Sequence, residues 1–175
     1  MKAFDLLRTL DRWDSQGLWA FDLPRLELIF DETPGSLKTA LMRHAKAGII
    51  TRVTRGIYVN PRARSMPAEP LLALVSIMRP YDFSYLSLES VLSDAGWISQ
   101  IPFCHTLMTS GRSGVFSTPY GVLEFTHTTR AENSQEVVFD GRRGVHVAAP
   151  ERAYLDLRYV RRNLAMVDVP SREAS

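Results

Sequence analysis

The sequence is poor in the residues that metal centres and disulfide frameworks require. It holds one cysteine, Cys104, and four histidines among 175 residues. A single cysteine cannot form an internal disulfide, and the zinc sites that need several thiolates are excluded. The histidines form no HxH or HExxH pair, the spacings that bring two imidazoles to one metal ion. We therefore expect a reducing compartment, no metal site and no cofactor.

Long apolar runs are also missing. No run approaches the ~20 residues that are needed to cross a bilayer. The first 14 residues, MKAFDLLRTLDRWD, contain acidic side chains where a secretory signal would continue as an apolar segment. These features predict a cytoplasmic protein. The hydrophobic content of 45% is ordinary for a globular chain, and the length allows one large domain or two small ones.

Acidic residues are absent from residues 33–67. The net charge of the whole chain is only +2, but the charges are unevenly distributed. Residues 1–66 carry 11 Lys and Arg against 7 Asp and Glu, whereas residues 67–175 carry 10 against 12. This asymmetry favours an anionic partner for the N-terminal third alone. The cations of the acid-free stretch are Lys38, Arg43, Lys46, Arg52, Arg55, Arg62 and Arg64.

The same stretch has the pattern of a helix followed by a hairpin. Residues 36–47 follow the helical period, and Gly48 ends the helix. Its apolar stripe is Leu37, Ala40, Leu41, His44 and Ala45. Strands at 49–53 and 57–60 flank a turn in which Arg55 and Gly56 suit a tight hairpin. This order is the outline of a winged helix, and a helix of about 12 residues, roughly 18 Å long, fits the major groove of DNA.

The polar side chains of this segment are therefore the predicted DNA-binding residues. Those expected to face the groove are Ser36, Thr39, Arg43 and Lys46. Those expected to contact phosphate are Lys38, Arg52 and Arg55. Two plainer interpretations compete: a basic amphipathic helix can be a solvated surface helix, and a hairpin-tip arginine can serve solubility. The lack of carboxylates along the whole stretch favours the DNA interface.

The remaining patterns predict an α+β chain. Helices are expected at 1–16 and 23–30, the second capped by Asp22, with a possible short strand at 18–21. Residues 1–61 form the predicted winged helix-turn-helix DNA-binding domain, and residues 62–70 form a proline-rich linker. Residues 71–175 form a predicted mixed α/β C-terminal domain with an antiparallel sheet. Its expected elements are helices at 69–78, 84–95 and 149–163, strands at 104–109, 121–128, 135–139 and 144–148, and a frayed tail at 167–175.

Enzyme chemistry finds little support in the sequence. The chain contains no GxGxxG, GxxxxGK[ST] or GxSxG motif. Four polar residues stand among apolar ones and could be a catalytic cluster or ordinary satisfied polar groups: Ser87, Glu89, Glu124 and Asp156. Asp156 could pair with Arg152, four residues earlier on one helix. A nuclease or nucleotide-processing site would use Glu124, His127 and Asp156. We predict no catalytic residue and a protein that is not an enzyme.

Four segments together resemble one protein family. They are SLKTALMRHAKAGIITRVTRGIYVNP at 36–61, YLSLESVLSDAGWI at 85–98, FSTPYGVLEFTHT at 116–128 and APERAYLDLRYV at 149–160. In order and spacing they resemble the AbiEi family of antitoxins and transcriptional regulators from type IV toxin–antitoxin systems. Members of that family often continue with further helices after the segment matching residues 155–157.

The resemblance implies an N-terminal winged helix that binds inverted repeats upstream of its own operon and represses it. It also implies a C-terminal domain that counteracts a toxin similar to nucleotidyltransferases, without necessarily forming a stable complex with it. A stand-alone winged-helix regulator and a protein-interaction module without a toxin partner remain the alternatives.

Overall fold

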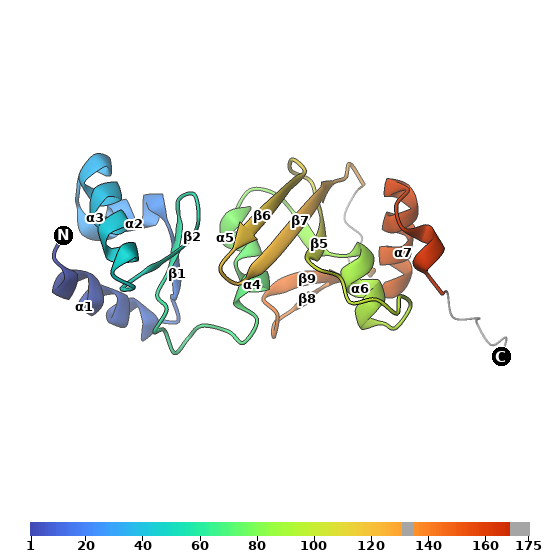
Figure 1. Cartoon of the computed structure of the whole chain (residues 1–175), viewed down its shortest axis with the longest axis horizontal. Coiled ribbons are helices and arrows are strands. Elements are labelled where there is room, and N and C mark those ends of the chain that lie inside the picture. Colours follow the sequence, from blue (N-terminus) through green and yellow to red (C-terminus); the bar gives the residue numbers. More distant parts are fainter. Residues whose placement is uncertain (131–134, 169–175) are drawn as a thin grey trace. The chain divides into compact units, whose positions relative to one another are not determined.

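The computed structural model describes residues 1–130 and 135–168, which divide into two compact units (Figure 1). Unit 1 contains Met1–Pro70 together with Thr118–Tyr120, and unit 2 contains Leu71–Ser117 and the chain from Gly121 onward. Both units combine helices with a β-sheet, so the fold class is α+β, in agreement with the prediction. Within the described residues, no helix has the length and apolar character needed to span a membrane.

Unit 1 is built from three helices and a three-stranded antiparallel sheet. The strands lie in the order β1-β3-β2, with Phe21 and Arg52 both opposite Tyr58. The carboxylate of Asp22 accepts a hydrogen bond from the backbone N–H of Arg25 at 2.9 Å, which caps α2 as predicted. The elements are α1 (Ala3–Asp14), β1 (Ala20–Asp22), α2 (Leu23–Phe30), α3 (Pro34–Lys46), β2 (Thr51–Thr54) and β3 (Ile57–Val59).

The apolar faces of these elements meet in one core. Its buried members are Leu6, Leu10, Phe21, Leu26, Leu37, Leu41, Ile50 and Tyr58. Burying a large apolar side chain contributes about 1.5–3 kcal/mol, so this core accounts for the position of α3. Four residues of the predicted stripe on α3 are buried, while Ala45 is half-buried. The opposite face of α3 is consequently left to solvent.

The start of the predicted linker is attached to unit 1. The backbone N–H groups of Arg64 and Ser65 each donate to the carboxylate of Asp14 at 2.9 Å, and the Ser65 hydroxyl donates to it as well. The hydroxyl and the two N–H groups hold the pKa of Asp14 below its usual value. Asp14 belongs to α1, so these bonds fix residues 64–65 against that helix.

Unit 2 contains a six-stranded sheet in the order β6-β7-β5-β4-β9-β8 among the described residues. Strand β4 is antiparallel to β5 and parallel to β9, and β5 is parallel to β7. Strands β8 and β9 are antiparallel. The sheet is therefore mixed, and the predicted antiparallel sheet is wrong. The strands are β4 (Ser84–Leu86), β5 (His105–Thr109), β6 (Gly114–Thr118), β7 (Gly121–His127), β8 (Val137–Asp140) and β9 (Val145–Ala148).

The helices of unit 2 differ from the prediction in two places. Residues 84–95 were predicted as one helix, but Ser84–Leu86 form the buried central strand and only Leu88–Asp94 are helical. A strand buried on both faces shows no alternation, so periodicity cannot separate it from a buried helix. The predicted helix 69–78 is divided at Leu74 into two short helices. The helices are α4 (Pro70–Ala73), α5 (Val75–Met78), α6 (Leu88–Asp94), α7 (Pro150–Val160) and the 3-10 helix η1 (Leu164–Met166).

The strands predicted for unit 2 agree with the structure better than its predicted helices do. Each of the four expected strands has a counterpart in β5, β7, β8 or β9, whereas β6 was not among them. In β6 the exposed and half-buried residues alternate and none is buried, so the apolar signal of this edge strand is weak. Helix α6 packs against both α7 and β5. Most of the frayed tail predicted at 167–175 lies outside the described residues.

Candidate nucleic-acid interface

Five cationic side chains lie on α3 and on the β2–β3 hairpin of unit 1. All five are exposed, and within residues 1–130 and 135–168 none of them forms an ion pair. The ion pairs of unit 1 join other groups, namely the amino terminus with Glu32 and Arg62 with Asp11. The exposed, unpaired side chains are Lys38, Arg43, Lys46, Arg52 and Arg55.

A hollow of about 530 Å³ is lined by residues of α3 and of the β2–β3 hairpin. Three of the five cations contribute to its walls. At the hairpin turn Gly56 has a φ of +79°, the left-handed region that glycine enters without strain. The pairing of β2 with β3 shifts by one residue between Arg52 and Thr54, so the ladder is irregular there. The lining residues are Leu23, Lys38, Met42, Arg52, Arg55, Gly56 and Tyr58.

Three of the four predicted groove-facing residues already make hydrogen bonds inside the chain. The Ser36 hydroxyl donates to the carboxylate of Glu32 at 2.8 Å. The Thr39 hydroxyl donates to the Gly35 carbonyl at 3.0 Å, and the Arg43 Nη2 donates to the Met1 carbonyl at 3.0 Å. Both hydroxyl oxygens keep acceptor capacity, and the Arg43 guanidinium keeps further N–H donors. Contacts from these residues to base edges would use that remaining capacity.

The cations predicted to contact phosphate are less constrained. The Arg52 Nε donates to the Thr54 carbonyl at 3.3 Å, a bond within the hairpin. Lys38 and Arg55 have no side-chain hydrogen bond to another residue that the structure describes. Lys46, at the end of α3, has none within the described residues either. These side chains can be directed at a phosphate without first breaking a strong internal bond.

A carboxylate that the sequence interpretation overlooked lies two residues before the first residue of α3. Glu32 accepts the hydrogen bond from Ser36, and its pKa is lowered first by the amino terminus and then by that hydroxyl. Glu32 is thus ionised at neutral pH beside the acid-free stretch. The signal was present in the sequence, because residues four apart at a helix start lie on the same side. The amino terminus pairs with this carboxylate and offsets its negative charge.

Among the described residues, the histidines and carboxylates do not gather into a metal centre. His44 is buried in α3, with its Nε2 3.3 Å from the Met1 carbonyl oxygen. In the described part of the chain, no group of three or more His, Cys, Asp or Glu side chains could hold a metal ion.

Asp156 in unit 2 is the centre of a buried polar network. It is fully buried and accepts hydrogen bonds from four side chains at 2.9–3.2 Å. The donors are Tyr85, Ser87, Arg130 and Arg152. The predicted pairing with Arg152 is confirmed. Burial, followed by the charge of Asp156, raises the pKa of Tyr85 to about 12, so its phenol keeps its proton and donates. A network satisfied in this way holds β4 to α7.

The three residues considered for a nuclease have separate partners. Glu124 is bound by Arg162, whose guanidinium holds the pKa of that carboxyl below its usual value. His127 Nδ1 lies 2.8 Å from the Gly111 carbonyl oxygen. No hydrogen bond or ion pair joins Glu124, His127 and Asp156 among the described residues. Arg162 instead connects Glu124 with Glu89, two of the polar residues noted in the sequence. They are far apart along the chain, so no spacing could have indicated this link.

No family model matches the sequence, and no curated protein gives a significant match to it. The resemblance to the AbiEi family therefore stays a prediction from four sequence segments. The described geometry offers an exposed cationic surface in unit 1 and closed polar networks in unit 2.

Proposed function

We propose that unit 1 is a winged helix-turn-helix domain that binds double-stranded DNA, with α3 as the recognition helix and the β2–β3 hairpin as the wing. The order of elements supports this proposal: a helix and a short strand, then two helices joined by a tight turn, then a hairpin that pairs with the first strand. In helix-turn-helix proteins the second helix of the pair enters the major groove. Here that helix is α3, whose 13 residues span about 20 Å.

The observation that carries the proposal is the set of five exposed cations on α3 and the hairpin that form no ion pair with any described residue. Cationic side chains on protein surfaces commonly have acidic neighbours that reduce their potential. Here Lys38, Arg52 and Arg55 line one hollow, so their positive potentials add along a single surface. Neutralising phosphates releases condensed counterions, and this release drives the association of such surfaces with DNA.

The wider role in our proposal is that of a transcriptional repressor that autoregulates its operon as the antitoxin of a type IV toxin–antitoxin system. This step rests on the resemblance of four sequence segments to the AbiEi family. The partner toxin would resemble nucleotidyltransferases, and the operator would contain inverted repeats. Unit 2 would then carry the neutralising function, since unit 1 supplies the DNA-binding surface.

Binding to duplex DNA from upstream of the gene tests the first part. Arg43→Ala should weaken binding to that DNA by about 1–3 kcal/mol and reduce discrimination against scrambled DNA, because a base-reading arginine carries specificity. Arg55→Ala should weaken binding to both DNAs equally. Arg142→Ala, at an exposed arginine of unit 2, is the matched control. It should change the affinity for neither the upstream DNA nor the scrambled DNA. Failure of the unmodified chain to bind either DNA at low salt would refute the proposal.

Co-expression with the neighbouring genes tests the antitoxin role. If one of them encodes a nucleotidyltransferase-like toxin, the full chain should restore growth of cells that express it. The double variant Arg43→Ala and Arg55→Ala should still restore growth, because neutralisation is assigned to unit 2. A chain that binds DNA but never restores growth would be a stand-alone regulator.

A further inference from the structure

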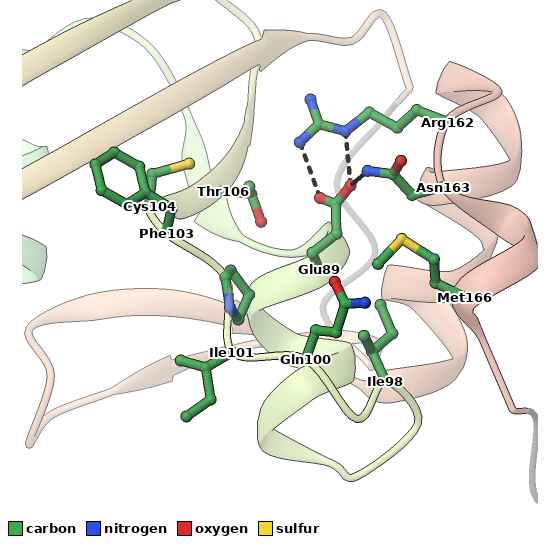
Figure 2. A pocket seen from close by; sticks show the side chains of 11 residues that line it. Glu89, Ile98, Gln100, Ile101, Phe103, Cys104, Thr106, Arg162, Asn163 and Met166 are labelled. Atoms are coloured by element: carbon green, nitrogen blue, oxygen red, sulfur yellow. Dashed lines mark hydrogen bonds and ion pairs between the residues drawn. The ribbon is translucent and has the colours of Figure 1, made fainter.

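Unit 2 contains a hollow of about 340 Å³ that the DNA-binding proposal does not use. It lies between the segment before β5 and the segment that follows α7, as Figure 2 shows. This volume is at the lower end of the range for small-molecule sites, about 300–1,000 Å³. The hollow is lined by Glu89, Ile98, Gln100, Ile101, Pro102, Phe103, Cys104, Thr106, Arg162, Asn163 and Met166.

Glu89 and Arg162 form the charged part of its lining, and Glu124 of β7, which does not line the hollow, completes the charged cluster by binding Arg162. Arg162 binds Glu89 through two hydrogen bonds, from Nε at 2.7 Å and from Nη2 at 3.0 Å (Figure 2). It also binds Glu124 through Nη1 and, at 3.2 Å, through Nη2. Asn163 Nδ2 donates to Glu89 at 2.7 Å. Two negative charges thus face one positive charge, and the cluster carries one uncompensated negative charge.

The position of Glu89 is fixed by the turn that leads from β4 into α6, whose first residue is Leu88. Leu88 is fully buried and has a φ of +57°, a left-handed conformation that residues other than glycine rarely adopt. The turn holds the next side chain, Glu89, at the edge of the hollow with only 10% of it exposed. Because Glu89 is largely desolvated, its charge acts more strongly on a ligand than a surface carboxylate would.

The other wall is apolar and partly open. Ile98 is buried, whereas Ile101 and Phe103 are 92% and 93% exposed. Met166 of η1 lies on the opposite side, next to Asn163 (Figure 2). Two large apolar side chains this exposed on one short loop form a surface that an apolar group can cover.

We propose that this hollow binds a small molecule that combines a cationic amino group with an apolar body. Four hydrogen bonds of Arg162 already go to the two carboxylates, so an anion finds few donors there and meets excess negative charge. Each carboxylate oxygen has two acceptor positions, and the Oε2 of Glu89 accepts only one hydrogen bond from the described residues. An ammonium group takes up such acceptor positions, and the apolar part of the ligand covers Ile101 and Phe103.

Binding of three matched probes to the isotope-labelled full chain tests the proposal by NMR. The probes are 2-phenylethylamine, 2-phenylethanol and phenylacetate, which share an aromatic ring and differ in charge. The amine should shift the backbone signals of residues 98–104 and 162–166 and should bind about tenfold more tightly than the alcohol, or about 1.4 kcal/mol. Phenylacetate should leave these signals unchanged. Equal affinity of amine and alcohol, or no shift with the amine, would overturn the proposal.

Two variants separate the roles of charge and apolar surface. Glu124→Gln removes the excess negative charge and should reduce the affinity of the amine to that of the alcohol. Phe103→Ala should weaken both ligands alike. The controls are Glu151→Gln, an exposed carboxylate at the start of α7, and Tyr81→Ala, a side chain that is 98% exposed. Neither control should alter binding.

The three probes on the unmodified chain test whether the hollow binds an amine even if a variant fails to fold. If Glu124→Gln folds and keeps the preference for the amine, the assigned role of the charge is wrong. Binding of an arginine-rich peptide without any binding of the amine would identify a protein-docking site and would also overturn the proposal. The inference does not rest on DNA binding, because its readout lies wholly in unit 2.

Discussion

The dependence of DNA affinity on salt is the sharpest test of the cationic surface on unit 1. Removing the hairpin-tip charge by Arg55→Ala is the cleanest perturbation, because this side chain is exposed and forms no ion pair with any described residue. The substitution leaves no carboxylate without a partner. The stability of unit 1 should therefore change by no more than about 0.5 kcal/mol.

The size of the effect follows from the number of phosphate contacts. Each phosphate that is neutralised contributes about −0.9 to the slope of log affinity against log salt. With Lys38, Arg52 and Arg55 as the phosphate contacts, one bound copy of unit 1 should give a slope of about −2.7. Arg55→Ala should reduce it to about −1.8. Between 50 and 200 mM salt the affinity should then fall about 40-fold for the unmodified chain and about 12-fold for the variant.

Fluorescence anisotropy with a labelled duplex, measured at several salt concentrations, gives these slopes directly. Two copies bound to an inverted repeat would double both values and leave their ratio unchanged. Arg142→Ala should reproduce the unmodified slope, because its charge belongs to unit 2. A slope near zero for the unmodified chain, or no change on Arg55→Ala, would refute the assignment of these side chains to phosphate.

Three further predictions concern stability. Asp156→Asn should destabilise unit 2 by about 3–5 kcal/mol, since its buried carboxylate pairs with two arginines. Asp94→Asn, at an exposed carboxylate that pairs with Arg143, should cost less than about 1 kcal/mol. Urea unfolding, monitored by hydrogen exchange, measures the loss of stability in both variants. Equal losses for Asp156→Asn and Asp94→Asn would contradict the buried network. Gly56→Ala should destabilise the hairpin by about 1–2 kcal/mol, because its φ of +79° disfavours side chains although an added Cβ has room; Gly56→Asn should cost less in the same measurement. The lowered pKa of Glu124 contributes stability that is present above its ordinary pKa and is lost as the pH falls through the folded value. Glu124→Gln should therefore flatten the acid limb of the stability curve, and an unchanged limb would show that the carboxylate contributes nothing.

The helices of unit 1 could be predicted because their signals are local. Asp22 and Pro24 mark the start of α2, and the buried stripe of α3 follows the helical period. Such signals need only a dozen neighbouring residues. The hydrogen bond from Arg43 to Met1 could not be predicted from a local pattern, because it joins residues 42 apart.

Unit 2 was harder to predict because its contacts are long-range. Tyr85 lies in a strand whose neighbours are contributed by residues 105–109 and 145–148, and no local pattern indicates that pairing. Parallel pairing in particular follows from how the chain crosses the sheet, not from side-chain alternation. For the same reason the pairing of Arg152 with Asp156, four residues apart, could be predicted, whereas the link from Arg162 to Glu89 could not.

The strand order of unit 2 also has a consequence during synthesis on the ribosome. The sheet of unit 1 is complete once Val59 has been made, but β4 lacks its neighbour β9 until Val145–Ala148 emerge. From Leu86 to Ala148 the ribosome adds 148 − 86 = 62 residues, so at 5–20 residues per second β4 waits about 3–12 s for β9. Throughout this wait the backbone N–H and C=O groups on the β9 side of β4 are unpaired, and such open edges are where chains pair wrongly with one another. Prematurely released chains should therefore aggregate through β4 while the sheet of unit 1 is already formed.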